Sequence, residues 1–189
     1  MKHPFPLFQS HLDLAHSYWK ELLSEESTVI DATCGNGHDT LALAAMPCKK
    51  VVAIDIQEEA IESAKERLDP SFKDKVSFYK QCHSTFPDEA APNSVQLIVY
   101  NLGYLPGGDK SQTTMAETTL LSIQNASLLL CRGGAISITC YPGHEEGALE
   151  EEKIIELVSQ WSPKEWSCCH HRWLNRKRSP SLLLIQKNL

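Results

Sequence analysis

Two glycines stand in a polar stretch that follows a short apolar segment early in the chain. Residues 29–40 read VIDATCGNGHDT, and Gly35 and Gly37 would let a ligand approach the backbone closely. Asp55 ends a second apolar segment, where a carboxylate is well placed to accept hydrogen bonds from the hydroxyls of a ribose. A glycine pair alone is also typical of a purely structural turn. Together with Asp55, it favours a ligand that contains a nucleoside.

The same stretch distinguishes two classes of nucleoside cofactor. A dinucleotide site usually has a third glycine where this chain has Thr40, and a pyrophosphate would lie near the negative charge of Asp31. S-adenosylmethionine has no phosphate and carries a sulfonium and an ammonium group, so it tolerates that carboxylate far better. We therefore predict S-adenosylmethionine as the cofactor. An NAD-dependent oxidoreductase remains the alternative from another enzyme class.

The residues expected to contact this cofactor follow the ends of four apolar segments. They are Asp31, Thr33, Cys34, Gly35, Asn36, Gly37, Asp39, Thr40, Asp55, Ile56, Gln57, Cys82, His83, Asn101 and Gly103. The stretch QCHST at 81–85 holds no acidic residue that could accept the adenine amino group. The sequence therefore leaves the adenine contact to Gln81 or to a backbone carbonyl.

The stretch NLGY at 101–104 could position an amine for methylation. The side-chain oxygen of Asn101 and the carbonyl of Leu102 can accept N–H bonds and direct the lone pair of the amine. Tyr104 can stack on a nucleobase. An alkyl ammonium must first lose a proton, although correct orientation could suffice without a dedicated base. The candidate bases are His83, His144 and Asp109.

A second cluster of polar residues lies near the end of the chain. Residues 164–178 combine cations, histidines and tryptophans, although the whole chain has a net charge of −6. This mixture is typical of a rim that contacts RNA phosphates, and a solvated hairpin turn is the competing interpretation. The residues expected to contact RNA are Lys110, Arg172, Asn175, Arg176, Lys177 and Arg178. The acidic stretch 145–156 should point away from RNA.

The run CCHH at 168–171 has the residue types of a metal site. Adjacent side chains of a strand point to opposite faces, so four consecutive ligands cannot converge. We therefore expect no metal there. A protein that binds RNA without catalysis remains a further alternative, but such a protein has no need of an amine-orienting stretch.

Strand-like and helix-like segments must position these residues. Helical patterns cover 11–23, 38–46, 57–68, 113–130 and 149–161, with Pro47 stopping the second helix and Gly133 and Gly134 closing the fourth. Strand patterns cover 28–32, 49–56, 75–82, 94–102, 135–140, 166–174 and 181–187. The alternation predicts an α/β fold with a seven-stranded, mostly parallel sheet and helices on both faces. Ligands should bind at the carboxyl ends of its strands.

Length and composition set wider bounds. The 189 residues, with 42% hydrophobic and 22% charged residues, fit one globular domain over 1–189, with an N-terminal helical segment at 1–27 packed on it. Seven cysteines without a CxxC pair suit reduced thiols in the cytoplasm. The chain has neither an apolar run of about 18 residues for a membrane span nor the apolar core of a signal peptide. A homodimer through the apolar N-terminal helix is left open.

Several of these motifs together resemble one known family. DATCGNG resembles the first motif of class I methyltransferases, although Thr33 stands where its first glycine falls, and NLGY resembles the (D/N)PPY motif of N-methyltransferases with Leu-Gly in place of Pro-Pro. DATCGNGHDT, AIDIQ, YNLGYLPGGDK, YPGH and NRKRSPSLLLIQK are similar to the YtqB/MnmM group of methyltransferases, over about residues 5–187. The resemblance implies a Rossmann-like fold and methylation of 5-aminomethyl-2-thiouridine at the tRNA wobble position, in the anticodon stem-loop. Ribosomal RNA or a small amine is the alternative acceptor.

Overall fold

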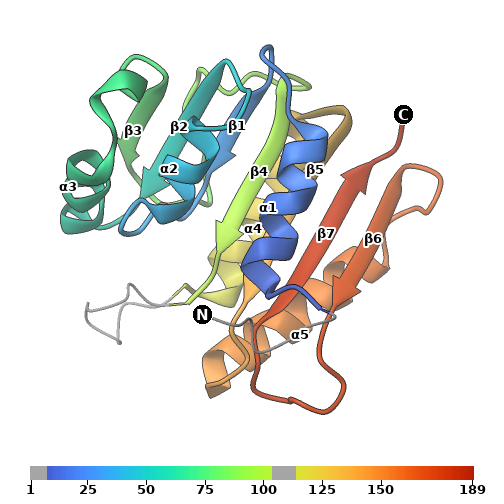
Figure 1. The fold of residues 1–189 in the computed structure, drawn as a ribbon. Helices are drawn as coiled ribbons and strands as arrows, with labels where there is room; N and C mark the ends of the chain where they lie inside the picture. The colour runs from blue at the N-terminus through green and yellow to red at the C-terminus, as the bar shows by residue number, and fades with distance from the viewer. Residues whose placement is uncertain (1–7, 104–113) are drawn as a thin grey trace.

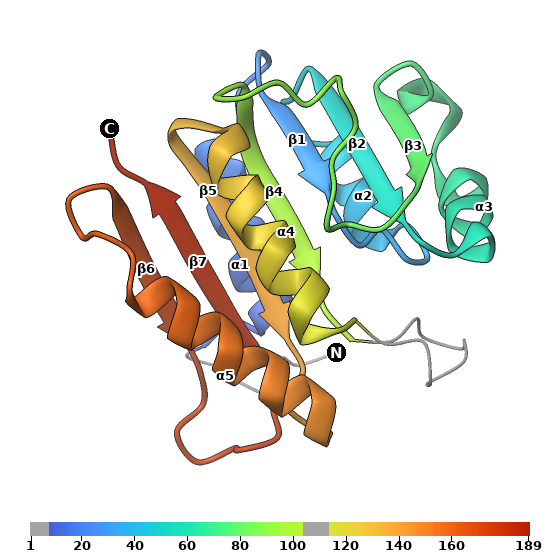
Figure 2. The same ribbon diagram turned by 180° about the vertical axis from the view of Figure 1, so that it is seen from behind.

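Seven strands form one sheet in the order β3-β2-β1-β4-β5-β7-β6 (Figures 1 and 2). The structure is a computed structural model, and it describes residues 8–103 and 114–189. The strands are β1 (Thr28–Asp31), β2 (Lys50–Asp55), β3 (Val76–Lys80), β4 (Val95–Asn101), β5 (Leu130–Cys140), β6 (Trp166–His171) and β7 (Ser181–Lys187). The helices are α1 (His11–Leu22), α2 (His38–Ala44), α3 (Glu58–Arg67), the short 3-10 helix η1 (Pro70–Phe72), α4 (Ala116–Leu129) and α5 (Glu145–Ser159).

The strand directions create a switch point next to β1. Strand β1 pairs in parallel with β2 on one side and with β4 on the other. Strands β3 and β5 extend this parallel sheet, whereas β7 is antiparallel to both β5 and β6. The predicted seven-stranded, mostly parallel sheet is therefore confirmed. After β1 the chain crosses to β2 on one side, and after β4 it crosses to β5 on the other side. The two connections therefore diverge and open a crevice at the carboxyl ends of β1 and β4.

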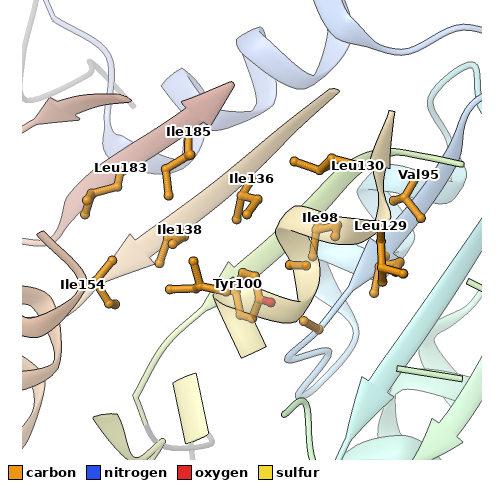
Figure 3. Packing of buried hydrophobic residues seen from close by; sticks show 14 of the residues in the cluster. Val95, Ile98, Tyr100, Leu129, Leu130, Ile136, Ile138, Ile154, Leu183 and Ile185 are labelled. Carbon is orange, nitrogen blue, oxygen red and sulfur yellow. The ribbon is translucent and has the colours of Figure 1, made fainter. Parts of the chain in front are cut away.

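Alternating strand residues divide the core into two layers. In β1 and β2, Ile30 and Val52 pack with α4 and α5, while their neighbours Val29 and Val51 pack with α1, α2 and α3. Figures 1 and 2 show these two groups of helices on opposite faces of the sheet. Figure 3 shows the first layer, where Ile98 and Ile138 lie among the apolar side chains of neighbouring strands. The period of two along each strand thus places helices on both faces.

Helix α1 uses its apolar face within the chain. The Ser10 side chain accepts a hydrogen bond from the Asp13 amide and caps the helix. Ala15 and Trp19 are buried against the sheet, with 0% and 2% of their surface exposed. The face that we considered for a homodimer is therefore already covered by the protein itself.

Two helix boundaries differ from the expectation. Helix α4 ends at Leu129, and Gly133 and Gly134 lie inside β5 rather than closing the helix. A Cβ at Gly134 would meet three backbone carbonyl oxygens at 3.0 Å, so close packing between strands, rather than a helix cap, requires glycine at this position. Helix α5 starts at Glu145 instead of residue 149 because His144 caps it. Among the described residues, no helix has both the length and the apolar character that crossing a membrane requires.

Candidate active site

A cavity of about 970 Å³ opens at the carboxyl ends of the parallel strands. It brings together the loop after β1, Asp55 at the end of β2, the loop after β3, the Asn101 segment after β4 and the loop after β5. Its volume lies at the upper end of the ~300–1,000 Å³ typical of small-molecule sites. The cavity therefore has room for a nucleoside cofactor and part of an acceptor.

The loop after β1 depends on its glycines. Gly35 and Gly37 adopt φ angles of 48° and 79°, in the left-handed region that favours glycine. A Cβ at Gly37 would also lie 2.7 Å from the backbone Cα of Ala64 in α3. Gly37 therefore lets the start of α2 pack against α3, while the backbone of Gly35 lines the cavity.

Asp55 lies beside this loop, and two backbone amides fix its carboxylate in place. The Gly35 amide donates to Asp55 Oδ2 at 2.9 Å, and the Gln57 amide donates to Oδ1 at 2.9 Å. Each carboxylate oxygen retains a further lone pair for a ligand hydroxyl. Ile56, next to it, has 61% of its surface exposed and lines the same cavity, which gives an aromatic ring an apolar surface.

Asp31, Gly37 and Thr40 lie behind the cavity and do not line it. Asp31 has no exposed surface, and its Oδ2 accepts a hydrogen bond from the Thr40 hydroxyl at 2.6 Å. Burial, helped by the nearby charge of Asp39, raises the pKa of Asp31 to about 7. The sequence placed Asp31 and Thr40 in direct contact with the cofactor. In the structure neither residue lines the cavity, and Asp31 holds the loop through Thr40 and the Thr33 amide (3.4 Å).

The loop after β3 forms another wall. Gln81, Cys82 and His83 all line the cavity, but the side-chain Nε2 of Gln81 donates to the carbonyl of Thr85 at 2.8 Å. Burial lowers the pKa of His83, so its ring is neutral near pH 7. Its backbone carbonyl accepts a hydrogen bond from Ser122 of α4 at 2.6 Å, which ties the loop to the helix beneath it.

Asn101 is held on three sides at the end of β4. Its amide donates to the Thr33 hydroxyl at 2.7 Å, and that hydroxyl donates to its carbonyl at 3.2 Å. Its side-chain Nδ2 donates to Asp39 Oδ2 at 3.2 Å. Asp39 Oδ1 lies 3.2 Å from Nε2 of His16, a residue of α1 that the sequence did not single out. Because Asp39 holds the nitrogen, the Asn101 Oδ1 atom is the one that can accept an amine N–H.

A buried carboxylate supports the next residues. Glu150 of α5 has 3% of its surface exposed and accepts hydrogen bonds from Thr114 (2.8 Å) and Thr119 (2.6 Å). Thr114 accepts from the Gly103 amide at 3.0 Å, and its own amide donates to the Gly103 carbonyl. Glu151 is also turned inward, towards Ser181 and His170. The acidic stretch that we expected to point away from RNA therefore contains two carboxylates with structural partners.

Three residues of the YPGH stretch line the cavity: Tyr141, Gly143 and His144. The Tyr141 ring packs edge-on against His11 of α1, with ring centroids 5.9 Å apart. Burial raises the pKa of the Tyr141 hydroxyl, the Asp39 charge adds to this, and a hydrogen bond to Asn101 opposes it. His144 Nδ1 accepts a hydrogen bond from the Gly147 amide at 3.1 Å and caps α5. That bond engages the lone pair of Nδ1 in the cap, so this nitrogen is not available to act as the base.

The remaining predicted residues separate into three groups. Tyr104, Asp109 and Lys110 lie outside the described residues. Arg178 lines the main cavity, while Arg172, Arg176 and Lys177 line a smaller pocket beside it, and Asn175 lies exposed in the same loop. Lys164 lies just before β6 and Trp166 begins it. Since Trp166 pairs with Lys187 and His171 pairs with Leu182, the start of β6 lies at the end of the strands opposite to the cavity. The basic rim is therefore shorter than the sequence suggested.

Sequence and structure comparisons identify the same group of proteins. Residues 51–187 match the family model described as "Putative rRNA methylase". The chain is 39% identical over 188 residues to the chloroplastic tRNA (mnm(5)s(2)U34)-methyltransferase of Arabidopsis thaliana, which covers 93% of this chain and 68% of that protein.

Solved structures of similar proteins share the fold. A protein of Clostridium thermocellum described as a "putative rRNA-methylase" superposes with a TM-score of 0.89 at 34% identity, over 95% of this chain and 98% of the other. A protein of Streptococcus mutans described as "a putative methyltransferase" and solved in complex with SAH superposes with a TM-score of 0.86 at 28% identity, over 96% and 99% of the two chains. SAH is the product that S-adenosylmethionine leaves after methyl transfer. The chain thus belongs to the "Putative rRNA methylase" family of S-adenosylmethionine-dependent methyltransferases.

Proposed function

We propose that this protein methylates the exocyclic amine of 5-aminomethyl-2-thiouridine at the wobble position of tRNA, forming 5-methylaminomethyl-2-thiouridine. The observation that carries the proposal is the placement of Asn101, held by Thr33 and Asp39, in the same cavity as the Gly35 and Asp55 cofactor elements. The similarity to the chloroplast wobble-uridine methyltransferase supports the choice of acceptor. We also propose that residues 1–189 act as one methyltransferase domain in the cytoplasm.

The lining residues fit S-adenosylmethionine. Asp55 would accept hydrogen bonds from the ribose hydroxyls, and Ile56 would cover one face of the adenine. The glycine backbone at Gly35 leaves space for the methionyl part of the cofactor. When bound, the cofactor supplies a methyl group on a positively charged sulfur.

The chain's own residues would orient the amine. Asn101 Oδ1 and the Leu102 carbonyl would accept its N–H bonds and turn its lone pair towards the methyl group. Asp39, whose side chain is 12% exposed, fixes the Asn101 amide and adds a negative charge that favours the arrival of a cationic amine. We assign no dedicated base to the described residues, since His144 Nδ1 caps a helix and His83 Nε2 lies 3.4 Å from the Thr119 hydroxyl.

The acceptor base needs apolar contact near this point. Met115 has 61% of its surface exposed and lines the cavity at the start of α4, beside Thr114 and Thr118. We propose that its side chain packs against the thiouridine ring. Arg178, which also lines the cavity, would contact the RNA backbone that enters with the base.

Nucleoside analysis of cells lacking the gene tests this proposal. Total tRNA should accumulate 5-aminomethyl-2-thiouridine and lose its methylated product. Restoring the wild-type gene should reverse the change, whereas restoring an Asn101→Ala gene should not. Normal levels of the methylated nucleoside in the deleted strain would refute the choice of acceptor.

A further inference from the structure

A small basic pocket of about 220 Å³ lies beside the main cavity. Its wall contains the cations Arg172, Arg176 and Lys177, and the hydroxyls of Ser179 and Ser181. Its volume is below the ~300 Å³ at which sites for drug-sized ligands begin. The pocket therefore suits a single small anionic group better than a nucleoside.

Residues 178–181 separate the pocket from the cavity, and alternate residues line one or the other. Along the segment before β7, Arg178 and Pro180 line the main cavity, whereas Ser179 and Ser181 line the small pocket. The turn after β5 also separates them, because Gly143 lines the cavity and Pro142 lines the pocket. The two turns touch: a Cβ at Gly143 would lie 3.5 Å from the carbonyl of Arg178. A group in the pocket would therefore lie directly beside a ligand in the cavity.

The cations are presented by a loop with its own internal structure. The Arg176 guanidinium lies 5.0 Å from the ring centroid of Trp173, and the Arg176 amide donates to the Trp173 carbonyl at 3.4 Å. The Ser179 amide donates to the Arg176 carbonyl at 3.0 Å, which closes a second turn. Trp173 is also packed edge-on against Phe8, with ring centroids 5.5 Å apart.

The charge balance of the pocket favours an anion. Glu151 is the one carboxylate among the described residues of its wall, and it accepts a hydrogen bond from Ser181 and lies 3.3 Å from His170 Nε2. Three cations against this carboxylate leave a local excess of positive charge on a chain whose net charge is −6. An RNA phosphate approaching this acidic protein would find in the pocket a local site of opposite charge.

We propose that this pocket binds the phosphodiester group next to the target nucleotide, while the target base occupies the main cavity. This assignment rests on the proposed function. The guanidinium and ammonium groups would hold the phosphate, and Ser179 would add a neutral donor. The pocket would thus fix the register of the RNA strand, so that only the nucleotide beside the bound phosphate can reach Asn101.

Coupling between the pocket and one RNA linkage tests the proposal. We would measure methyl transfer to an anticodon stem-loop carrying 5-aminomethyl-2-thiouridine, and to two versions with a neutral methylphosphonate on either side of that nucleotide. The double variant Arg176→Gln/Lys177→Gln should raise KM for the natural RNA by about tenfold, as expected for lost charged hydrogen bonds. One neutral linkage should raise KM of the wild type similarly, and combining it with the double variant should cause little further loss.

The control variant Lys49→Gln/Lys164→Gln removes the same charge at the opposite edge of the sheet. It should leave KM and the coupling unchanged. If the losses from the pocket variant and from each neutral linkage multiply, the pocket does not hold either phosphate and the proposal fails.

A binding measurement separates this failure from that of the proposed function. The affinity for an unmodified stem-loop can be measured at several salt concentrations without methyl transfer. In the pocket variant, the slope of log affinity against log salt concentration should become shallower by about 0.7 for each lost phosphate contact. An unchanged salt slope overturns the phosphate pocket. A changed slope, together with absence of transfer to the wobble nucleotide, would keep the pocket and reject only the acceptor.

Discussion

Replacing Asp39 by asparagine should slow methyl transfer while leaving the cofactor bound. Asp39 accepts a hydrogen bond from Asn101 Nδ2 at 3.2 Å and lies 3.2 Å from His16 Nε2. In the Asp39→Asn variant, a neutral oxygen would face Asn101, and the second position would become an N–H donor facing the imidazole. The shape of the side chain would remain, but the charge that fixes Asn101 would be lost.

The size of the effect follows from these contacts. Hydrogen bonds to charged groups contribute about 1.5–3 kcal/mol, and the Asp39 side chain is only 12% exposed, so solvent screens it little. A loss of about 2 kcal/mol in transition-state stabilisation corresponds to a fall of roughly thirtyfold in kcat/KM. His16 contacts Asp39 rather than Asn101 and is more exposed, so His16→Gln should lower kcat/KM by only about threefold.

Single-turnover transfer and calorimetric titration of S-adenosylmethionine would separate the two effects. The Asp39→Asn variant should bind the cofactor within about twofold of the wild type, and its rate should fall at every pH rather than shift its pH profile. Lys20→Gln, on the same helix as His16 but exposed, serves as a control and should behave as the wild type. An unchanged rate, or equal losses of rate and cofactor affinity, would refute the positioning role.

Three further substitutions test other parts of the site. Asp55→Ala should weaken S-adenosylmethionine binding about tenfold or more, measured by calorimetry, because it removes the proposed ribose acceptor and releases the Gly35 amide; unchanged affinity would reject the ribose contact. Asp31→Asn should stabilise the protein at pH 8 but much less at pH 5. Because the pKa of Asp31 is raised from 3.8 to about 7 in the folded protein, the wild type loses up to about 4 kcal/mol of stability as the pH rises through this range. If denaturant unfolding showed the same gain in free energy of unfolding at both pH values, this explanation would be wrong. Gly37→Ala should lower the free energy of unfolding by about 2–4 kcal/mol, since it combines a φ of 79° with a 2.7 Å approach to Ala64. Gly143→Ala, where the new Cβ meets its nearest atom at 3.5 Å, should cost much less, and similar losses at both glycines would contradict the packing argument.

The sequence predicted the features that depend on local pattern. Apolar runs and their turns located the strands, and strand ends located Gly35, Asp55 and Asn101, because parallel strands place their carboxyl ends at one edge of a sheet. Tyr141 was within reach of the same reasoning. It stands in the loop after β5 next to the residues we considered, and its type suits a cavity wall.

The contacts that the sequence did not reveal join distant segments. His16 reaches Asp39 only because α1 packs across the sheet, and nothing in the helical pattern distinguishes this histidine from its neighbours. In the sequence, Glu150 resembles the other acidic residues of its helix. Its burial depends on α4, whose Thr119 donates a hydrogen bond to it. Asp31 looked like a ligand-binding residue, whereas the complete burial that makes it a loop support depends on packing that the sequence alone does not display.

Transfer of a labelled methyl group by the purified protein tests the central claim most directly. The acceptor would be bulk tRNA from cells lacking this protein, incubated with labelled S-adenosylmethionine, digested to nucleosides and separated by mass spectrometry. We expect label in 5-methylaminomethyl-2-thiouridine with the wild type and no label with the Asn101→Ala variant. Label in a different nucleoside, or transfer to ribosomal RNA but not to tRNA, would contradict the central claim.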